Sequence, residues 1–328
     1  MRFEDIAKLS FGALCVLVSS ALCSTVHAQA QPYPVRPITL VVPTPPGNST
    51  DIVGRTAAQQ ASIALGVPFV IENRPGASTL LASSWVARAP ADGYTLLLIS
   101  SAMTGALALG RVPQISLDQL APITTIANAP LALLVRSTAP SGSVAEFVSY
   151  AKSAPDKVNL GTNGVGTSSH LTAVKFSMDA GFPVTDIPYP GIGQVIQELM
   201  AGRVDMTFDT LTSALGHVKS GRVKLMAVTS KERSAASPET PTLRELGYPD
   251  VVYTPWWGIA APAGTPETIL RQLEKAFVDA GQNVQVRERL IAAGTNPLFS
   301  PRSEATATMK DDLAYWTTII RKAGIKVQ

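Results

Sequence analysis

Apolar residues recur along the chain in short runs that alternate with stretches of helical spacing. The run at residues 38–42 predicts a buried strand, and Ile52, Val53, Ala57 and Ala61 behind it predict the inward face of a helix. Repeated alternation of this kind is typical of a parallel sheet covered by helices. The strands expected from the same pattern span residues 38–42, 69–71, 94–99, 158–161, 184–187, 204–208 and 223–228.

Two further β-like runs are long enough to pass between two lobes. The run at 122–135, interrupted by Asn-Ala-Pro, would leave the first lobe, and the run at 251–261 would return to it. Three helices follow, and they need a sheet to lie against. We therefore expect an α/β protein of two lobes joined by a two-strand hinge, with residues 31–128 and 254–328 in lobe 1 and residues 129–253 inserted as lobe 2.

The loop after the first strand combines rigidity with helix-capping residues. Pro43, Pro45 and Pro46 exclude both strand pairing and helix, and Gly47 allows the chain to turn. Residues 49–51, Ser-Thr-Asp, are all N-cap types and should begin the next helix. Unpaired N–H groups at such a helix start favour an anion. An ordinary strand–helix turn with a good cap would show the same pattern.

The second lobe has a glycine-rich turn of its own at residues 161–170. It follows a strand and opens a helix, but its glycine spacing fits neither a dinucleotide fingerprint nor a P-loop. Ser100 and Ser101 end a strand of the first lobe and should share the sheet edge of the first loop. Two such loops facing one cleft would suit a ligand with a carboxylate at each end.

Several residues near these loops allow a structural or a functional interpretation. His170 is either a hydrogen-bonding structural residue or a ligand contact. Asp209 either faces the cleft or caps the next helix, and Tyr189 either walls the cleft or packs. Trp257 could also wall the cleft, but core packing is expected for Trp256 and Trp257 together.

The chain lacks the signatures of common enzymes. It has no Gly-x-Ser-x-Gly elbow and no paired histidines. A hydrolase triad of Ser168, His170 and Asp209 is a remote alternative, because Ser168 and His170 lie two positions apart at a helix start and would point in different directions. We therefore expect a binding protein and no enzyme.

The first residues predict a signal peptide. An uncharged apolar run at 9–23 is followed by small-residue cleavage patterns, and we expect cleavage near Ala30 and export to the periplasm. A membrane anchor is the alternative, although the run is short for a span. Cys15 and Cys23, the only two cysteines, lie in this segment, so the mature chain should have no disulfide, thiolate or metal site and no cofactor.

The formal net charge of +3 over 328 residues is too small to predict nucleic-acid binding, and Lys and Arg form no cluster.

Several motifs in order resemble the Bug family, the TctC-like extracytoplasmic solute receptors of tripartite tricarboxylate transporters. The resemblance covers essentially the whole mature chain. Its most specific parts are Glu-Asn-Arg-Pro-Gly-Ala at 72–77 and Asp-Gly-Tyr-Thr-Leu at 92–96. The other segments are 42–47 with Asp51, Gly166–Thr167 with His170, 201–206, 225–230 and 257–266.

The resemblance implies a type II periplasmic-binding-protein fold that closes on a small carboxylate, such as a di- or tricarboxylate, an acidic amino acid or an aromatic acid. The first loop would hold one carboxylate, partly through ordered waters, and the second lobe would contact the rest. Contacts carried over by position are Thr44, Gly47, Ser49, Asp51, Ser100, Ser101, Gly166, Thr167, Ser168, His170 and Asp209, to which Asn48 and Tyr189 are added.

Two positions depart from the family pattern. Asn48 replaces a glycine that is usual after Gly47, and Pro190 replaces a lysine that is common after Tyr189. The first change adds a side chain near the expected ligand, and the second removes a cation. Both affect the size and charge of the ligand that would fit.

The function expected from these features is that of a monomeric solute-binding protein. It would capture a carboxylate, close on it, and deliver it to the membrane subunits of a tripartite transporter. The alternative is a ligand sensor of the same fold that presents to a receptor kinase.

Overall fold

The computed structural model describes residues 33–110, 115–140, 142–153, 158–164 and 166–323. The expected signal peptide, its cleavage site near Ala30 and both cysteines lie outside the described residues, as does Val165 of the glycine-rich turn. Residues 1–35 and residues 36–328 form separate units, and the elements below belong to the second. No helix in the described part of the chain is both long and apolar enough to span a membrane.

The first sheet has six strands in the order β11-β4-β10-β3-β1-β2. Strands β1, β2 and β3 are parallel to one another, while β10 runs antiparallel to β3 and β4, and β11 runs antiparallel to β4. The strands are β1 (Ile38–Val42), β2 (Phe69–Asn73), β3 (Thr95–Ser100), β4 (Leu120–Asn128), β10 (Trp256–Pro262) and β11 (Asn296–Pro297). The helices are α2 (Ser49–Leu65), α3 (Leu80–Ala87), α4 (Ser101–Ala108), α9 (Glu267–Ala280), α10 (Val284–Ala292) and α11 (Arg302–Ala323), with short 3-10 turns η1 (Ala77–Thr79) and η2 (Leu117–Gln119).

The second sheet has five strands in the order β7-β6-β8-β5-β9. Strand β6 is parallel to β7 and β8, and β5 is antiparallel to β8 and β9. The strands are β5 (Leu131–Arg136), β6 (Asn159–Thr162), β7 (Thr185–Pro188), β8 (Met206–Thr210) and β9 (Val223–Val228). The helices are α5 (Val144–Ser153), α6 (Ser168–Ala180), α7 (Ile192–Met200) and α8 (Leu211–Lys219). We call the two sheets with their helices the first and second lobe.

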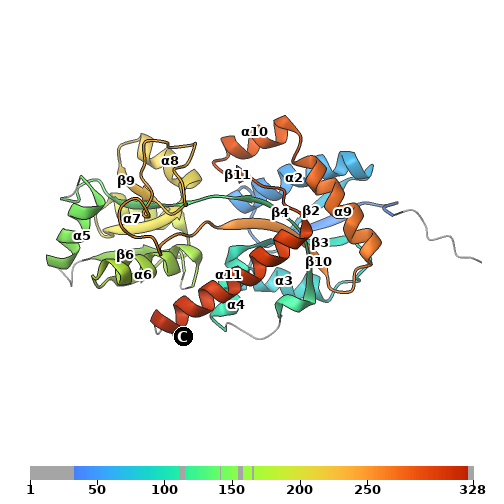
Figure 1. Cartoon of the computed structure of the whole chain (residues 1–328), viewed down its shortest axis with the longest axis horizontal. Coiled ribbons are helices and arrows are strands. Elements are labelled where there is room, and N and C mark those ends of the chain that lie inside the picture. The colour runs from blue at the N-terminus through green and yellow to red at the C-terminus, as the bar shows by residue number, and fades with distance from the viewer. Residues whose placement is uncertain (1–32, 111–114, 141, 154–157, 165, 324–328) are drawn as a thin grey trace, which may run out of the picture. The chain divides into compact units, whose positions relative to one another are not determined.

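The chain passes between the two sheets where the sequence predicts. Strand β4 ends in the first sheet at Asn128 and β5 begins in the second at Leu131, while β9 ends at Val228 and the chain re-enters the first sheet with β10. Figure 1 shows the two groups of elements with these segments between them. The two predicted crossings are therefore present, and the exact lobe boundaries stay a prediction.

The last helix, α11, packs against both lobes. Met309 belongs to the core of the first lobe, but Trp316, Ile319 and Ile320 belong to the core around the second sheet. The Trp316 indole N–H donates to the Tyr253 hydroxyl at 3.0 Å. In Figure 1, α11 runs from one group of elements toward the other. The sequence predicts that this helix packs on the first sheet, and only its first half does so.

Two local predictions were wrong. The apolar spacing at 78–89 predicts a helix, but α3 begins only at Leu80, because residues 77–79 have positive φ and form a 3-10 turn. Ile52 is 42% exposed, since the buried face of α2 is made by Val53, Ala57 and Ala61. The short strand β11 was not predicted.

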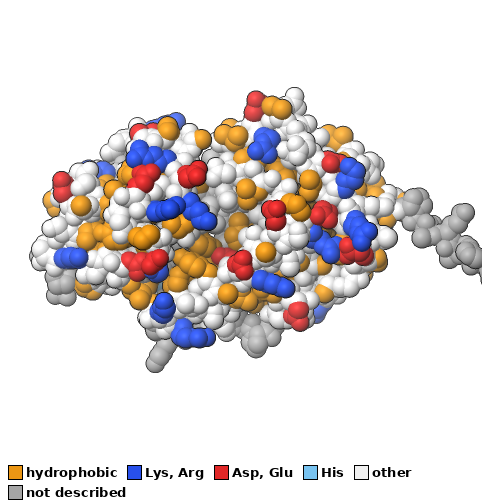
Figure 2. All heavy atoms as spheres, viewed as in Figure 1, with side chains coloured by type: hydrophobic (Ala, Val, Ile, Leu, Met, Phe, Trp, Pro, Cys, Tyr) orange, Lys and Arg blue, Asp and Glu red, His pale blue; other side chains and the backbone are white. Residues whose placement is uncertain are grey.

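Charged side chains of both signs are interspersed on the face seen in Figure 2. This distribution agrees with the small net charge of the chain.

Candidate functional site

The first loop is capped by Asn48, one residue before the predicted capping residues. Asn48 is extended, and its side-chain oxygen accepts the Asp51 N–H at 2.9 Å and the Thr44 hydroxyl proton at 3.1 Å. An extended asparagine directly before a helix reaches the N–H three residues on, which is the geometry that capping requires. Ser49, Thr50 and Asp51 are therefore the first residues of α2.

Asp51 holds the loop together from inside. Its buried carboxylate accepts hydrogen bonds from Gly47 N–H at 3.0 Å, Arg55 Nε at 2.8 Å and Asn73 Nδ2 at 2.9 Å. Burial alone would raise the pKa of Asp51, but the bonds from Arg55, Asn73 and Gly47 outweigh it, and the pKa lies below its ordinary value. Asp51 thus joins the turn at Gly47 to the first turn of α2.

Asn73 joins this loop to the neighbouring strand. Its amide donates to the Thr44 carbonyl oxygen and to Asp51, both at 2.9 Å, and its oxygen accepts from Arg55 Nη2 at 3.0 Å. Sequence reasoning gave Asn73 no role beyond the family motif. A usable signal was present, because Asn73 ends a strand that pairs with β1 opposite Val42, directly before the loop.

The start of α2 presents donors that no described residue accepts. Among the described residues, the N–H groups of Ser49 and Thr50 have no acceptor, as the first turn of a helix predicts. The one acidic side chain here, Asp51, is neutralised by Arg55. Free N–H groups and the helix dipole at this point favour an anion.

The second loop is built around Thr167 and His170. The Thr167 hydroxyl caps α6 by accepting the His170 N–H at 3.3 Å. The His170 ring is buried, its Nδ1 accepts the Gly166 N–H at 3.1 Å, and its Nε2 lies 3.5 Å from Asp186 Oδ2. The structural interpretation of His170 is confirmed by these bonds, and its contact with a ligand stays a prediction.

Gly166 is required by packing between the lobes. Its φ is +81°, and an added Cβ would lie 1.6 Å from Leu109 Cδ1, just beyond the end of α4. A Cβ on Gly105 of α4 would in turn lie 3.0 Å from the Gly166 carbonyl oxygen. Leu109 therefore fills the space that a Gly166 side chain would need.

A second contact between the lobes lies at α8. The Thr212 hydroxyl donates to the Gly294 carbonyl oxygen at 2.8 Å, in the turn between α10 and β11. The lobes therefore touch through α4 and α6 and again through α8 and this turn.

Ser100 and Ser101 are both buried at the start of α4, where Ser100 is the N-cap. Below them lies a polar cluster that the sequence did not predict. Asp312 of α11 accepts from the Thr104 hydroxyl and, at 3.0 Å, from the Trp256 indole N–H. Burial raises the pKa of Asp312 to about 6, and these bonds offset only part of the rise.

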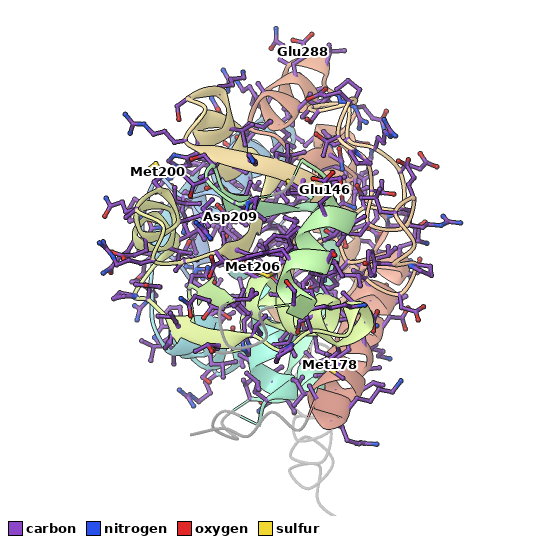
Figure 3. All side chains as sticks on the ribbon, turned by 90° about the vertical axis from the view of Figure 1, so that its left-hand side faces the viewer. Glu146, Met178, Met200, Met206, Asp209 and Glu288 are labelled. Atoms are coloured by element: carbon purple, nitrogen blue, oxygen red, sulfur yellow. The ribbon has the colours of Figure 1, made fainter. Side chains whose placement is uncertain are left out.

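Asp209 lies in the interior of the second lobe (Figure 3). Its Oδ1 accepts the Thr210 N–H at 2.7 Å, while Oδ2 is buried without a hydrogen bond to any described residue. Burial raises the pKa of Asp209 to about 6, and the nearby Ser213 hydroxyl and Thr210 N–H offset only part of this rise. The N-cap of α8 is Thr210, so the prediction that Asp209 is this cap was wrong by one residue.

Tyr189 follows β7 and packs against the apolar cluster between α7, α8 and the second sheet. Burial raises its pKa. Packing of Tyr189 is thus confirmed, and its role as a wall of the cleft stays a prediction. Ser168 is the first residue of α6 and is half-buried.

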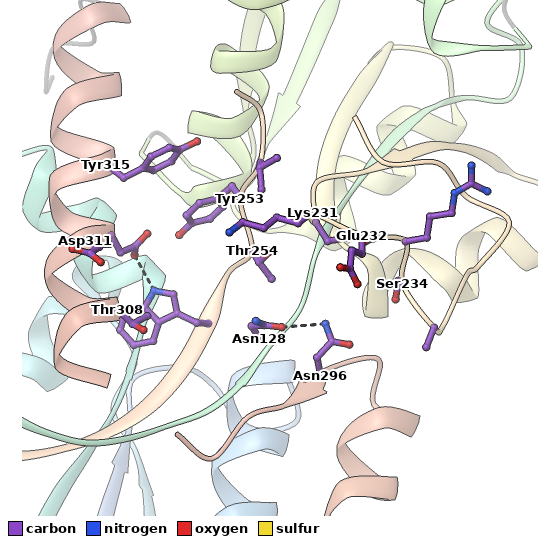
Figure 4. A pocket seen from close by; sticks show the side chains of 16 residues that line it. Asn128, Lys231, Glu232, Ser234, Tyr253, Thr254, Asn296, Thr308, Asp311 and Tyr315 are labelled. Atoms are coloured by element: carbon purple, nitrogen blue, oxygen red, sulfur yellow. Dashed lines mark hydrogen bonds between the residues drawn. The ribbon is translucent and has the colours of Figure 1, made fainter. Parts of the chain in front are cut away.

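A pocket of about 800 Å³ lies elsewhere, beside both crossings (Figure 4). It is lined by Asn128 and Thr254 at the crossings, by Lys231 of the loop after β9, and by Asp311 and Tyr315 of α11. None of the predicted ligand contacts lines it.

The chain matches the family model described as "Tripartite tricarboxylate transporter family receptor" over residues 53–325. It is 33% identical over 302 residues to protein BugT of Bordetella pertussis, covering 91% of this chain and 93% of that protein.

Two solved structures support the same relationship. MatC from Rhodopseudomonas palustris with bound malate superposes with a TM-score of 0.77 at 31% identity, covering 88% of this chain and all of that one. R. palustris Rpa4515 with adipate gives a TM-score of 0.81 at 30% identity, covering 90% and 99%. The protein therefore belongs to the TctC family of periplasmic solute-binding receptors, has their two-lobed α/β fold, and is a receptor and not an enzyme.

Proposed function

We propose that this receptor binds a small carboxylate between its first and second loops and delivers it to the membrane subunits of a tripartite transporter. The observation that carries the proposal is the start of α2, where N–H groups with no acceptor among the described residues lie beside a loop fixed by Asp51, Arg55 and Asn73. The malate and adipate bound by two similar receptors support a di-acid as the first ligand to test.

The charge of the first loop favours recognition through hydrogen bonds. Arg55 is the basic residue nearest the helix start, and it is already paired with Asp51 at 2.8 Å. A carboxylate at this point would therefore be held by N–H and hydroxyl donors and by the helix dipole, not by an ion pair. Pro190 in place of the family's common lysine fits the same kind of site.

The proposal also covers export and oligomeric state. We infer that residues 1–30 direct export to the periplasm and are removed, and that the mature receptor acts as a monomer. The predicted ligand contacts, from Thr44 to Asp209, remain part of this proposal.

Calorimetry and thermal melting of the mature protein test the ligand class. The protein is first unfolded and refolded to release any trapped ligand, and is then titrated with malate, adipate, succinate, glutarate, citrate, glutamate and benzoate. A ligand that binds only the folded state stabilises it by about 2.7 kcal/mol at a hundredfold excess over its dissociation constant. The matching diamides serve as controls and should not bind. If no acid binds the refolded protein, the carboxylate proposal is wrong.

A further inference from the structure

Two adjacent tryptophans of β10 bond to opposite faces of the first sheet. The Trp256 indole N–H donates to Asp312, below the sheet edge where α4 and α11 pack. The Trp257 indole N–H donates instead to the Thr50 hydroxyl oxygen at 2.9 Å, at the start of α2. Both rings are buried, as core packing predicts, but only Trp257 reaches the proposed carboxylate site.

The bond from Trp257 fixes what the Thr50 hydroxyl can do. An indole N–H is a donor only, so Thr50 Oγ1 must accept it. The hydroxyl keeps its own proton, and among the described residues it has no acceptor for that proton. Thr50 is half-buried and lies in the same helical turn as the free N–H groups of Ser49 and Thr50 itself. Its proton is therefore available to a group outside the chain.

Trp257 also holds the neighbouring turn. Its backbone lies opposite Ser100 in the β10–β3 pair, and Ser100 is the N-cap of α4. One buried residue thus connects the start of α2 to the start of α4. These are the two helix starts at which ligand contacts are expected in the first lobe.

We propose that Thr50 is a further ligand contact and that Trp257 is its positioning residue. By occupying one of the two lone pairs of Thr50 Oγ1, Trp257 orients this hydroxyl so that its proton can be donated to a carboxylate oxygen. This inference rests on the proposed carboxylate site and adds one side-chain donor to it.

The experiment compares four variants by calorimetry, using as probe whichever of malate, adipate, succinate and glutarate binds the wild type most tightly. Thr50→Val and Trp257→Phe should each weaken binding about tenfold, which corresponds to ~1.4 kcal/mol for one hydrogen bond to a charged group. Thr50→Ser keeps the hydroxyl and should stay within about twofold of the wild type. Trp256→Phe is the matched control, since it removes an indole bond on the opposite face, and should leave affinity unchanged.

The double variant separates positioning from a general structural effect. If Trp257 acts through Thr50, then Trp257→Phe has no additional effect on affinity in the Thr50→Val background. Additive losses overturn the positioning role, and unchanged affinity in Thr50→Val overturns the contact. Melting without ligand identifies a variant that fails to fold. If Trp257→Phe fails to fold, the indole N–H resonance of Trp257 in the Thr50 variants tests the bond instead. It should move in Thr50→Val and stay in place in Thr50→Ser.

The two proposals fail differently. A wild type that binds none of the acids overturns the carboxylate site and this inference with it. A wild type that binds, together with unaffected Thr50→Val and Trp257→Phe, overturns this inference alone.

Discussion

The two loops expected to hold the ligand are stabilised by different means. The first is closed by polar bonds inside one lobe, where Asp51 accepts from Gly47, Arg55 and Asn73. The second depends on the other lobe, because Leu109 packs where a side chain of Gly166 would lie. The bonds of the first loop need no residue of the other lobe, whereas the packing of the second includes Leu109 of the other lobe.

One buried carboxylate in each lobe shows a further contrast. Asp51 and Asp209 are 3% and 5% exposed, yet the pKa of Asp51 lies below its ordinary value and the pKa of Asp209 rises to about 6. Asp51 has three donors, whereas one oxygen of Asp209 has no hydrogen-bond partner among the described residues. Asp209 also lies deeper in the protein interior, so the depth of burial and the donors together set the difference in pKa.

The largest expected effect is that of Gly166→Ala. The new Cβ would overlap Leu109 Cδ1 and force a non-glycine residue into positive φ, which together should cost about 3–4 kcal/mol of unfolding free energy. Gly47→Ala is the matched control, because Gly47 also has positive φ but no atom within 4 Å of an added Cβ. It should lose only about 1 kcal/mol in urea unfolding. Equal losses for the two variants would contradict packing across the lobes at Gly166.

The next effect is that of Asp51→Asn. The amide removes the charge that Arg55 pairs with and places an NH₂ group against one of the three donors, so stability at pH 7 should fall by about 2–3 kcal/mol. Because the folded pKa of Asp51 is lowered, the wild-type advantage is present above its unfolded pKa and is lost as the pH falls through the folded pKa. Urea titrations from pH 7 down to pH 3 should show the two proteins converging.

Asp209→Asn should have the opposite sign. A carboxyl whose folded pKa is about 6 takes up a proton more readily when folded, so its ionised form destabilises the fold above that pH. The variant should be more stable than wild type at pH 8, by on the order of 2 kcal/mol, and the difference should vanish as the pH falls toward 4. Asp312 has a similarly raised pKa, so the test is the variant-minus-wild-type difference and not the wild-type profile. A destabilised variant at pH 8 would show that Asp209 Oδ2 has a donor.

The order of elements and both crossings could be predicted from sequence because their signals are local. Apolar spacing and turn residues distinguish strands from helices within a few positions, and a strand interrupted near Pro130 marks a crossing. The contacts that shape the loops are not local. Asn73 and Thr44 lie 29 positions apart, and Trp257 and Thr50 lie 207 apart. Such pairs follow from strand order, which the pattern does not specify.

The structure also differs from the sequence-based prediction where neighbouring residues have similar properties. Four consecutive residues at 48–51 are all N-cap types, and only backbone geometry selects Asn48. Trp256 and Trp257 alternate faces as any strand does, so their different partners could have been expected once β10 was assigned.

The smallest expected effect concerns Asn48, where the family usually has glycine. Its side chain folds back onto the Asp51 N–H and the Thr44 hydroxyl, so it acts as a cap and not as an obstacle. Asn48→Gly should therefore cost only a few tenths of a kcal/mol, because glycine is itself an acceptable N-cap, whereas Asn48→Ala should cost about 1 kcal/mol. Thermal melting of the pair measures this difference, and calorimetry with the tightest-binding acid should show little change in affinity for Asn48→Gly. A large gain in affinity would mean that the Asn48 side chain restricts the ligand, and the capped first loop would then be narrower than that of a glycine-containing relative.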